Sequence, residues 1–385
     1  MNKLICLIQE LCPNGVEYLP LEKCCAILDN KRKPVTKAAR EAGEYPYYGA
    51  NGIQDYVSDY IFNGTFVLVG EDGSVITSNG TPVVTWATGK IWVNNHAHII
   101  SEIDGVLLRY LFHYLQTVNV TPLIHGNIPK LTGGDFRVLR IPLPPLAVQQ
   151  EIVRILDSFT ELTAELTAEL TAELTARRKQ YEHYRDELLT FGDDVPRISL
   201  GEVGPVCMCK RILKSQTNDI GGVPFYKIGT FGKKANAYIS EDTYKEYHSK
   251  YNFPKKGDVL ISAAGTIGRT VVYDGKPAYF QDSNIVWIAN DESKILNRFL
   301  IYCYAMKPWY VSTGGTIARL YNDNILKARI PAPSLEQQAF IVDTLDRFDR
   351  ICNDLTSGLP AEIAAQQKQY EYYRDKLLTF KELER

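Results

Sequence analysis

The sequence lacks the features that mark a membrane protein or a secreted protein. Its apolar runs fall short of the roughly eighteen residues that a transmembrane helix requires. The N-terminal segment has too short an apolar stretch, and no cleavage site, for a signal peptide. With 45% apolar and 23% charged residues, the composition is that of an ordinary globular protein in water, and no membrane association is expected.

Catalytic signatures are also missing. No phosphate-binding loop occurs, because Gly229-Thr-Phe-Gly-Lys-Lys does not have the required spacing. No nucleophile elbow or zinc-protease motif occurs. The Asn/Asp-Pro-Pro-Tyr/Phe loop that an amino-methyltransferase would use is absent as well. The sequence therefore predicts a chain that binds rather than catalyses.

Metal-binding patterns are weak. The eight cysteines are scattered, and the close pairs Cys24-Cys25 and Cys207-Met-Cys209 lack a partner pair at zinc-ligand spacing. Such thiols are expected to be reduced, as in the cytoplasm. His96 and His98 could ligate a metal, but alternating histidines on a strand more often face solvent or form hydrogen bonds. No metal is expected.

The net charge of −2 gives no global basic signature, so a nucleic-acid surface would have to be a local patch. What the chain does have is one long segment, residues 146–191, without proline or glycine. Glu-Leu-Thr-Ala occurs four times in residues 161–176. Apolar residues recur at helical spacing, at Ile152, Ile155, Phe159, Leu162, Leu166, Leu170 and Leu174. The pattern predicts a helix of roughly 70 Å, a spacer or coiled-coil arm.

The long segment occurs twice. Ile141-Pro-Leu-Pro-Pro-Leu matches Ile330-Pro-Ala-Pro-Ser-Leu, and 330 − 141 = 189. Lys179-Gln-Tyr-Glu-His-Tyr-Arg-Asp matches Lys368-Gln-Tyr-Glu-Tyr-Tyr-Arg-Asp at the same offset. The apolar positions Leu162, Leu166, Leu170 and Leu174 correspond to Ile351, Leu355, Leu359 and Ile363. Two helices with matched apolar faces are expected to bury each other, with a break in the second at Ser357-Gly-Leu-Pro360.

Two globular regions, residues 26–140 and 203–329, alternate with these helices. Residues 2–12 and 105–118 are predicted helices in the first half, and 65–69 and 90–93 are predicted strands. The second region repeats the frame: Pro224-Phe-Tyr226 parallels Pro46-Tyr-Tyr48, and Gly315–Leu320 parallels Gly126–Leu131. The apolar frame is kept while the loops differ, which suits one scaffold that recognises two targets.

Polar side chains on the corresponding loops could pair with base edges or neutralise phosphates. The alternative is that each is an ordinary solvated residue. The first region supplies Lys31, Arg32, Lys33, Tyr48, Asn51, Asn94, Asn95, His96, Asn127 and Lys130. The second supplies Lys210, Arg211, Lys214, Lys227, Lys233, Lys234, Thr266, Arg269, Gln281, Asn284, Thr316 and Arg319.

Tyrosines gather near the ends of the long helices. They either pack one helix on the other or form a surface for a partner protein, because aromatic residues are enriched at interfaces. The set consists of Tyr181, Tyr184, Tyr370, Tyr372 and Tyr373.

The whole chain resembles the DNA-specificity subunit of type I restriction–modification systems. The resemblance rests on two variable globes that alternate with near-identical helices. Each helix is introduced by Ile-Pro-x-Pro and a Gln-Gln pair and closed by Lys-Gln-Tyr-Glu-x-Tyr-Arg-Asp-x-Leu-Leu, and the first carries the Thr-Ala-Glu-Leu tandem. It implies an α+β fold in which two mixed α/β target-recognition domains are separated by two long antiparallel coiled-coil helices.

The same resemblance implies a role and partners. Each globe would read one half of a bipartite site in double-stranded DNA. Two modification subunits would bind S-adenosylmethionine and methylate adenine, and restriction subunits would use ATP and Mg. This chain would hold no cofactor and no catalytic centre. A structural coiled-coil adapter, and a DNA-modifying enzyme with an unrecognised catalytic centre, remain the alternatives.

The expected domain limits follow the duplication. They are residues 1–25 for an N-terminal segment, 26–143 for the first target-recognition domain, 144–191 for the central helix, 192–332 for the second target-recognition domain and 333–385 for the C-terminal helix.

Overall fold

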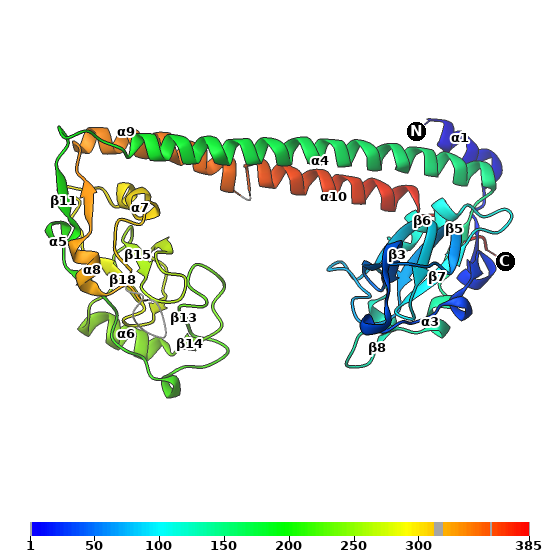
Figure 1. The fold of residues 1–385 in the computed structure, drawn as a ribbon, viewed down its shortest axis with the longest axis horizontal. Helices are drawn as coiled ribbons and strands as arrows, with labels where there is room; N and C mark the ends of the chain where they lie inside the picture. Colours follow the sequence, from blue (N-terminus) through cyan, green and yellow to red (C-terminus); the bar gives the residue numbers. More distant parts are fainter. Residues whose placement is uncertain (1, 312–318, 355, 385) are drawn as a thin grey trace. The chain divides into compact units, whose positions relative to one another are not determined.

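The computed structural model describes residues 2–311, 319–354 and 356–384. The chain forms two compact units, one of Met1–Leu170 with Ile363–Arg385 and one of Thr171–Glu362. Each unit contains one globe, built of strands and short helices, and part of the long helices (Figure 1). The fold is therefore α+β, as expected. Among the described residues, every helix is too short or too polar to cross a bilayer.

A six-stranded sheet forms the first globe. Its strands run in the order β2 (Ala26–Ile27), β7 (Ala97–Ser101), β5 (Phe62–Gly70), β6 (Val84–Val93), β3 (Ala42–Gly49) and β4 (Gly52–Val57). All neighbours are antiparallel except β3 and β6, which run parallel and pair Tyr48 with Val93. The predicted strands at 65–69 and 90–93 lie in β5 and β6, which confirms them.

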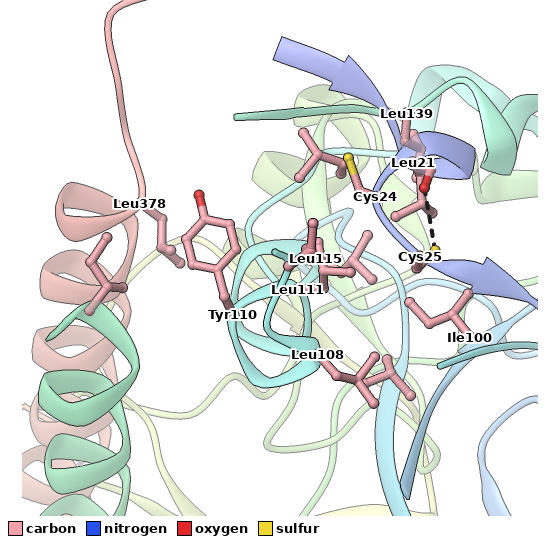
Figure 2. Close-up of a cluster of buried hydrophobic side chains, with 14 of the residues drawn as sticks. Leu21, Cys24, Cys25, Ile100, Leu108, Tyr110, Leu111, Leu115, Leu139 and Leu378 are labelled. Carbon is pink, nitrogen blue, oxygen red and sulfur yellow. Dashed lines mark hydrogen bonds between the residues drawn. The ribbon is translucent and has the colours of Figure 1, made fainter. Parts of the chain in front are cut away.

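Short elements complete this globe and connect it to the long helices. They are α1 (Asn2–Leu11), β1 (Glu17–Pro20), α2 (Leu108–Leu115), β8 (Ile124–His125), β9 (Lys130–Leu131), α3 (Gly133–Arg137) and β10 (Arg140–Leu143). The predicted helices at 2–12 and 105–118 are thus confirmed as α1 and α2. Figure 2 shows Tyr110 and Leu111 of α2 in the core, with Leu378 from the C-terminal segment beside Tyr110. The core of the globe and the end of the last helix are one apolar cluster.

Two smaller sheets form the second globe. One has the order β12 (Val206–Cys207), β18 (Ile285–Ile288), β15 (Val259–Ser262) and β16 (Thr270–Val272), and the other has β14 (Tyr238–Ile239), β13 (Val223–Tyr226) and β17 (Tyr279–Phe280). A separate pair, β11 (Arg197–Ser199) and β19 (Arg329–Pro331), matches β1 and β10. The helices are α5 (Leu200–Val203), α6 (Glu241–Lys250), α7 (Asn297–Ala305) and α8 (Asn322–Lys327).

Three long helices carry the repeated segments. They are α4 (Leu146–Leu188), α9 (Leu335–Asn353) and α10 (Leu359–Leu377). The break expected at residues 357–360 is confirmed, because α9 ends before it and Pro360 lies in the first turn of α10. Proline is tolerated there, since the first N–H groups of a helix have no intrahelical acceptor.

Each unit contains one antiparallel helix pair, and the 189-residue offset relates the two pairs. In the first unit, the rings of Phe159 and Tyr373 lie 6.1 Å apart. In the second, the rings of Phe348 and Tyr184 lie 5.4 Å apart. Because 159 + 189 = 348 and 184 + 189 = 373, the same contact is made twice with the roles of the helices exchanged.

The joint between each globe and its helix is also duplicated. Gln149 is fully buried, accepts a hydrogen bond from the N–H of Leu107 and donates to the carbonyls of Gly105 and Pro144. Gln338 is bound in the same way by Leu296 and by the carbonyls of Lys294 and Pro333. Since 149 + 189 = 338, a glutamine at the same duplicated position anchors a loop of each globe on the first turns of its helix.

The compact units divide the chain inside α4, at Leu170, and not at the ends of the helices. The unit limits group residues by packing, whereas the expected domain limits follow the internal duplication of the sequence. Those domain limits therefore stay a prediction.

Candidate nucleic-acid interface

Three loops of the first globe converge at one end of the parallel strand pair β3 and β6. The N–H of Asn94, the residue after β6, donates to the carbonyl of Tyr48 (3.1 Å). The N–H of Glu71 donates to the carbonyl of His96 (2.8 Å), and that of Leu131 donates to the carbonyl of Glu71 (2.8 Å). Backbone hydrogen bonds therefore hold together loops that lie far apart in the sequence.

The second globe builds the same arrangement. The N–H of Gln281, directly after β17, donates to the carbonyl of Tyr226 (2.9 Å). Arg319 forms an isolated antiparallel bridge with Ala264, as Lys130 does with Asp72 in the first globe. Since 130 + 189 = 319, the duplication places a basic residue at the same point of both loop clusters.

A further basic residue is held at each cluster by an aromatic side chain. The indole Nε1–H of Trp92 donates to the carbonyl of Lys33 (2.6 Å), and the hydroxyl of Tyr279 donates to the carbonyl of Lys210 (2.9 Å). The side chains of Lys33 and Lys210 are exposed. Each globe thus presents lysine and polar groups on a fixed frame, as a surface that binds phosphates and base edges requires.

Arg32 does not belong to that exposed surface, which corrects the role expected of it. Its guanidinium donates to Glu71 (2.5 Å) and to the carbonyl of Ala97 (2.7 Å), and its side chain is only 12% exposed. The neighbouring His98 is fully buried between Asp29 and the carbonyl of Leu131. Arg32 therefore stabilises the loops from within.

The side chains of Asp29, Glu71 and His98 lie close enough together to hold a metal ion. Their ligand atoms are already engaged, however, because His98 binds Asp29 (2.6 Å) and Arg32 binds Glu71. Burial acts to raise the pKa of Asp29, but the hydrogen bond and charge of His98, the N–H of Ile99 and the charge of Arg32 together outweigh it and hold that pKa below its usual range. This donor set fits an internal ion-pair network better than a cation site.

Asn94 and Tyr48 are also internal, a second correction. Asn94 is 2% exposed, and its side chain accepts from the N–H of His96 and donates to Oε1 of Gln54. Tyr48 is 7% exposed, and burial, with Tyr56 nearby, raises the pKa of its hydroxyl. Neither side chain is free to reach a base directly.

The other candidates of the first globe lie at its surface. His96 bonds Asp72 through Nδ1, and Lys130 pairs with Glu71 (3.3 Å). The exposed members are Lys31, Lys33, Asn51, Asn95, His96 and Asn127, and Lys130 is half-buried. Their contact with DNA stays a prediction.

In the second globe, two arginines are partly committed to backbone carbonyls. Arg269 donates to Phe231 (3.0 Å) and Arg319 to Ser283 (3.1 Å). The exposed candidates are Lys210, Arg211, Lys214, Lys233, Lys234 and Thr266, and the half-buried ones are Lys227, Arg269, Gln281, Asn284 and Arg319. Thr316 lies outside the described residues.

Four of the five helix tyrosines pack against the opposing helix, which favours the packing interpretation for them. The hydroxyl of Thr160 donates a hydrogen bond to the hydroxyl oxygen of Tyr370 (3.0 Å). Tyr373 and Tyr184 contact phenylalanines, and Tyr181 packs against the apolar core of the second unit. Tyr372 is 61% exposed, so it alone of the five stays a clear candidate for a partner contact.

Comparison with protein families assigns the chain. The model of the type I restriction modification DNA specificity domain matches it twice, at residues 13–176 and 193–365. The chain belongs to this family. DNA recognition is therefore the role of this type I specificity chain, and the two matches coincide with the two halves of the duplication.

Curated relatives agree over nearly the full length. A putative type I restriction enzyme specificity subunit of Haemophilus influenzae is 53% identical over 370 residues, which covers 95% of this chain and 96% of the relative. The EcoR124I/EcoR124II specificity subunit of Escherichia coli is 30% identical over 352 residues, with 82% and 85% covered.

Solved structures show the same fold. A chain from a type I restriction–modification structure on complex assembly and conformational transition superposes with a TM-score of 0.64 at 18% identity, covering 95% of this chain and 98% of that one. The HsdS subunit from Thermoanaerobacter tengcongensis gives 0.50 at 17% identity, with 96% of both chains covered. At these identities, the likeness supports the fold alone.

Proposed function

We propose that each globe of this chain reads one half of a bipartite site in double-stranded DNA. The observation that carries the proposal is the repeated loop cluster. In each globe, a polar residue follows one strand of the parallel pair, and its N–H donates to a tyrosine carbonyl of the other strand. An exposed lysine lies at the same cluster, and a second basic residue forms an isolated β-bridge there. The frames agree while the exposed side chains differ, so the two clusters suit two different base sequences.

The long helices set the distance between the half-sites and dock two modification subunits. Support comes from the two helix pairs, which are related by the internal duplication and so offer two equivalent surfaces. The modification subunits supply S-adenosylmethionine and methylate adenine, and the restriction subunits use ATP and Mg. This chain carries no chemical step. Its cysteines, none of which forms a disulfide among the described residues, suit the cytoplasm.

An exchange of one globe tests the proposal. Residues 26–143 are replaced by the corresponding region of a relative, and the chimera is expressed with its modification subunit. Mapping of methylated adenines across the host genome is expected to show one changed half-site and one unchanged half-site.

The reciprocal exchange of residues 192–332 is the matched control and must change the other half. A change of both half-sites in either chimera would show that the globes do not read independently. If the wild-type complex has no sequence-dependent affinity for DNA in a gel-shift assay, the adapter alternative is correct.

A further inference from the structure

The first globe contains an exposed glutamine that the sequence pattern did not single out. Gln54 lies in β4 at a β-bulge, because Tyr47 pairs with Asp55 and Tyr48 pairs with Ile53, which leaves Gln54 without a partner residue. A bulge turns a side chain out of the regular alternation of a strand and re-aims it. Here it directs Gln54 toward Asn94 in the loop cluster.

A chain of hydrogen bonds determines which way this amide points. The N–H of His96 donates to Oδ1 of Asn94 (2.8 Å), so the other end of the Asn94 amide must be its NH2 group. That NH2 group donates to Oε1 of Gln54 (3.2 Å). The oxygen of Gln54 is therefore held by the globe. Gln54 is an exposed residue, and its Nε2 lies over Gly49 with no hydrogen bond to another described residue.

Gly49 makes room for the amide. A Cβ atom at this position would collide with the end of the Gln54 side chain. Gly49 is not in a backbone conformation that requires glycine, so the missing side chain serves space and not turn geometry. Since the obstructing group is the end of a flexible side chain, an alanine here would displace the amide without disturbing the backbone.

In the second globe, one glutamine takes the places of both Asn94 and Gln54. Gln281 occupies the place of Asn94, since the N–H of each donates to the tyrosine at the end of the parallel pair. Its Oε1 accepts a hydrogen bond from the N–H of Ile228 (3.1 Å), which again fixes the amide orientation. No hydrogen bond links its Nε2 to another described residue, and this atom is not fully buried. Lys227, the residue before Ile228, is half-buried beside it.

We propose that Gln54 and Gln281 are specificity-determining residues that donate from Nε2 to an acceptor on a base edge in the major groove. The inference rests on the proposed function and identifies, in each globe, an atom that contacts a base. Glutamine recognises adenine by donating to N7 and accepting from the 6-amino group at once. The globe already occupies one lone pair of each oxygen, so Nε2 is the freer end of these amides and suits an acceptor, which can be purine N7, guanine O6 or thymine O4. Asn94 is a positioning residue for Gln54.

The test uses the full chain in complex with its modification subunit. Gln54→Met and Gln281→Met keep side-chain length and remove the donors. Each variant is expected to relax one base position in its own half-site, with about 5- to 150-fold lower discrimination there, and to leave the other half-site intact. Gly49→Ala, which retains the glutamine, is expected to act like Gln54→Met. The unaffected half-site reports that the complex has folded.

The matched control is Gln216→Met. Gln216 accepts from the N–H of Leu213 in the same way, but its Nε2 is already bonded to the hydroxyl of Tyr247. It is expected to leave both half-sites unchanged. A chemical check uses the wild-type protein and DNA that carries a 7-deazapurine at the position relaxed in the variant. If N7 is the acceptor, this base is expected to cause the same loss of discrimination. If discrimination is unchanged, the contact is assigned to O6 or O4.

Two results would overturn the inference. One is an unchanged half-site in Gln54→Met and Gln281→Met. The other is equal weakening on all sequences with a flatter salt dependence, which would indicate phosphate contacts. Neither result contradicts the proposed function, because the proposed function fails only if the wild-type complex does not recognise a bipartite site.

Discussion

Replacement of Gln149 by leucine is predicted to destabilise the first unit strongly. The change keeps most of the side-chain volume but removes every polar group of the fully buried amide. The N–H of Leu107 and the carbonyls of Gly105 and Pro144 then lose partners at 2.9, 3.1 and 2.8 Å. At about 1 kcal/mol for each hydrogen bond, the expected loss is about 3 kcal/mol, and buried groups left unpaired increase it.

Amide hydrogen exchange measures this effect locally, which matters because a chain of two units does not unfold in one step. A loss of about 3 kcal/mol corresponds to roughly 150-fold faster exchange at the N–H of Leu107. The neighbouring exposed Gln150 gives the control variant Gln150→Leu, which is expected to leave this rate unchanged. Equal exchange rates in the two variants would refute the argument. Gln338→Leu is expected to repeat the effect at Leu296 in the second unit.

The remaining predictions concern pH, the repeat and one arginine. Burial lowers the pKa of His113, although Asp157 acts to raise it, so on acidification the unfolded state binds the proton before the folded state does. The thermal stability of the first unit should therefore fall as the pH drops below about 6.5. The variant His113→Tyr, which copies Tyr302 of the second unit, should remove this pH dependence. Deletion of Thr167–Leu170 shortens α4 by about 6 Å and turns it by roughly 40°; methylome mapping should show the same half-sites with a spacer shorter by about one base pair, and an unchanged spacer would contradict the role of the repeat. Arg319→Ala should weaken DNA binding. Loss of a base contact should cost about 1–3 kcal/mol at one base position, whereas loss of a phosphate contact should weaken binding to all sequences and reduce its salt dependence. Unchanged affinity at all salt concentrations would show that Arg319 contacts neither.

Residue spacing alone predicted the architecture of this chain. The constant 189-residue offset, the helical spacing of leucines and the absence of proline and glycine from residues 146–191 identified two matched helices and two globes. Pro360 located the break between α9 and α10. These features depend on backbone chemistry and on local periodicity, both of which are properties of the sequence itself.

The sequence also placed two basic residues on equivalent loops of the two globes. The match of residues 315–320 with 126–131 brought Lys130 and Arg319 to equivalent positions, and the structure gives both the same bridge. Loop position could be inferred because the flanking strands carry the apolar pattern of the duplication.

Only the tertiary structure decided which polar side chains face outward. Arg32, Asn94 and Gln54 each have a polar neighbour in the sequence, yet Arg32 is bound to Glu71, Asn94 is buried and Gln54 is exposed. Their partners lie about forty residues away along the chain, as in the pair of Asn94 with Gln54. A hydrogen bond between such distant groups exists only after the sheet has formed, because strand pairing brings the loops together.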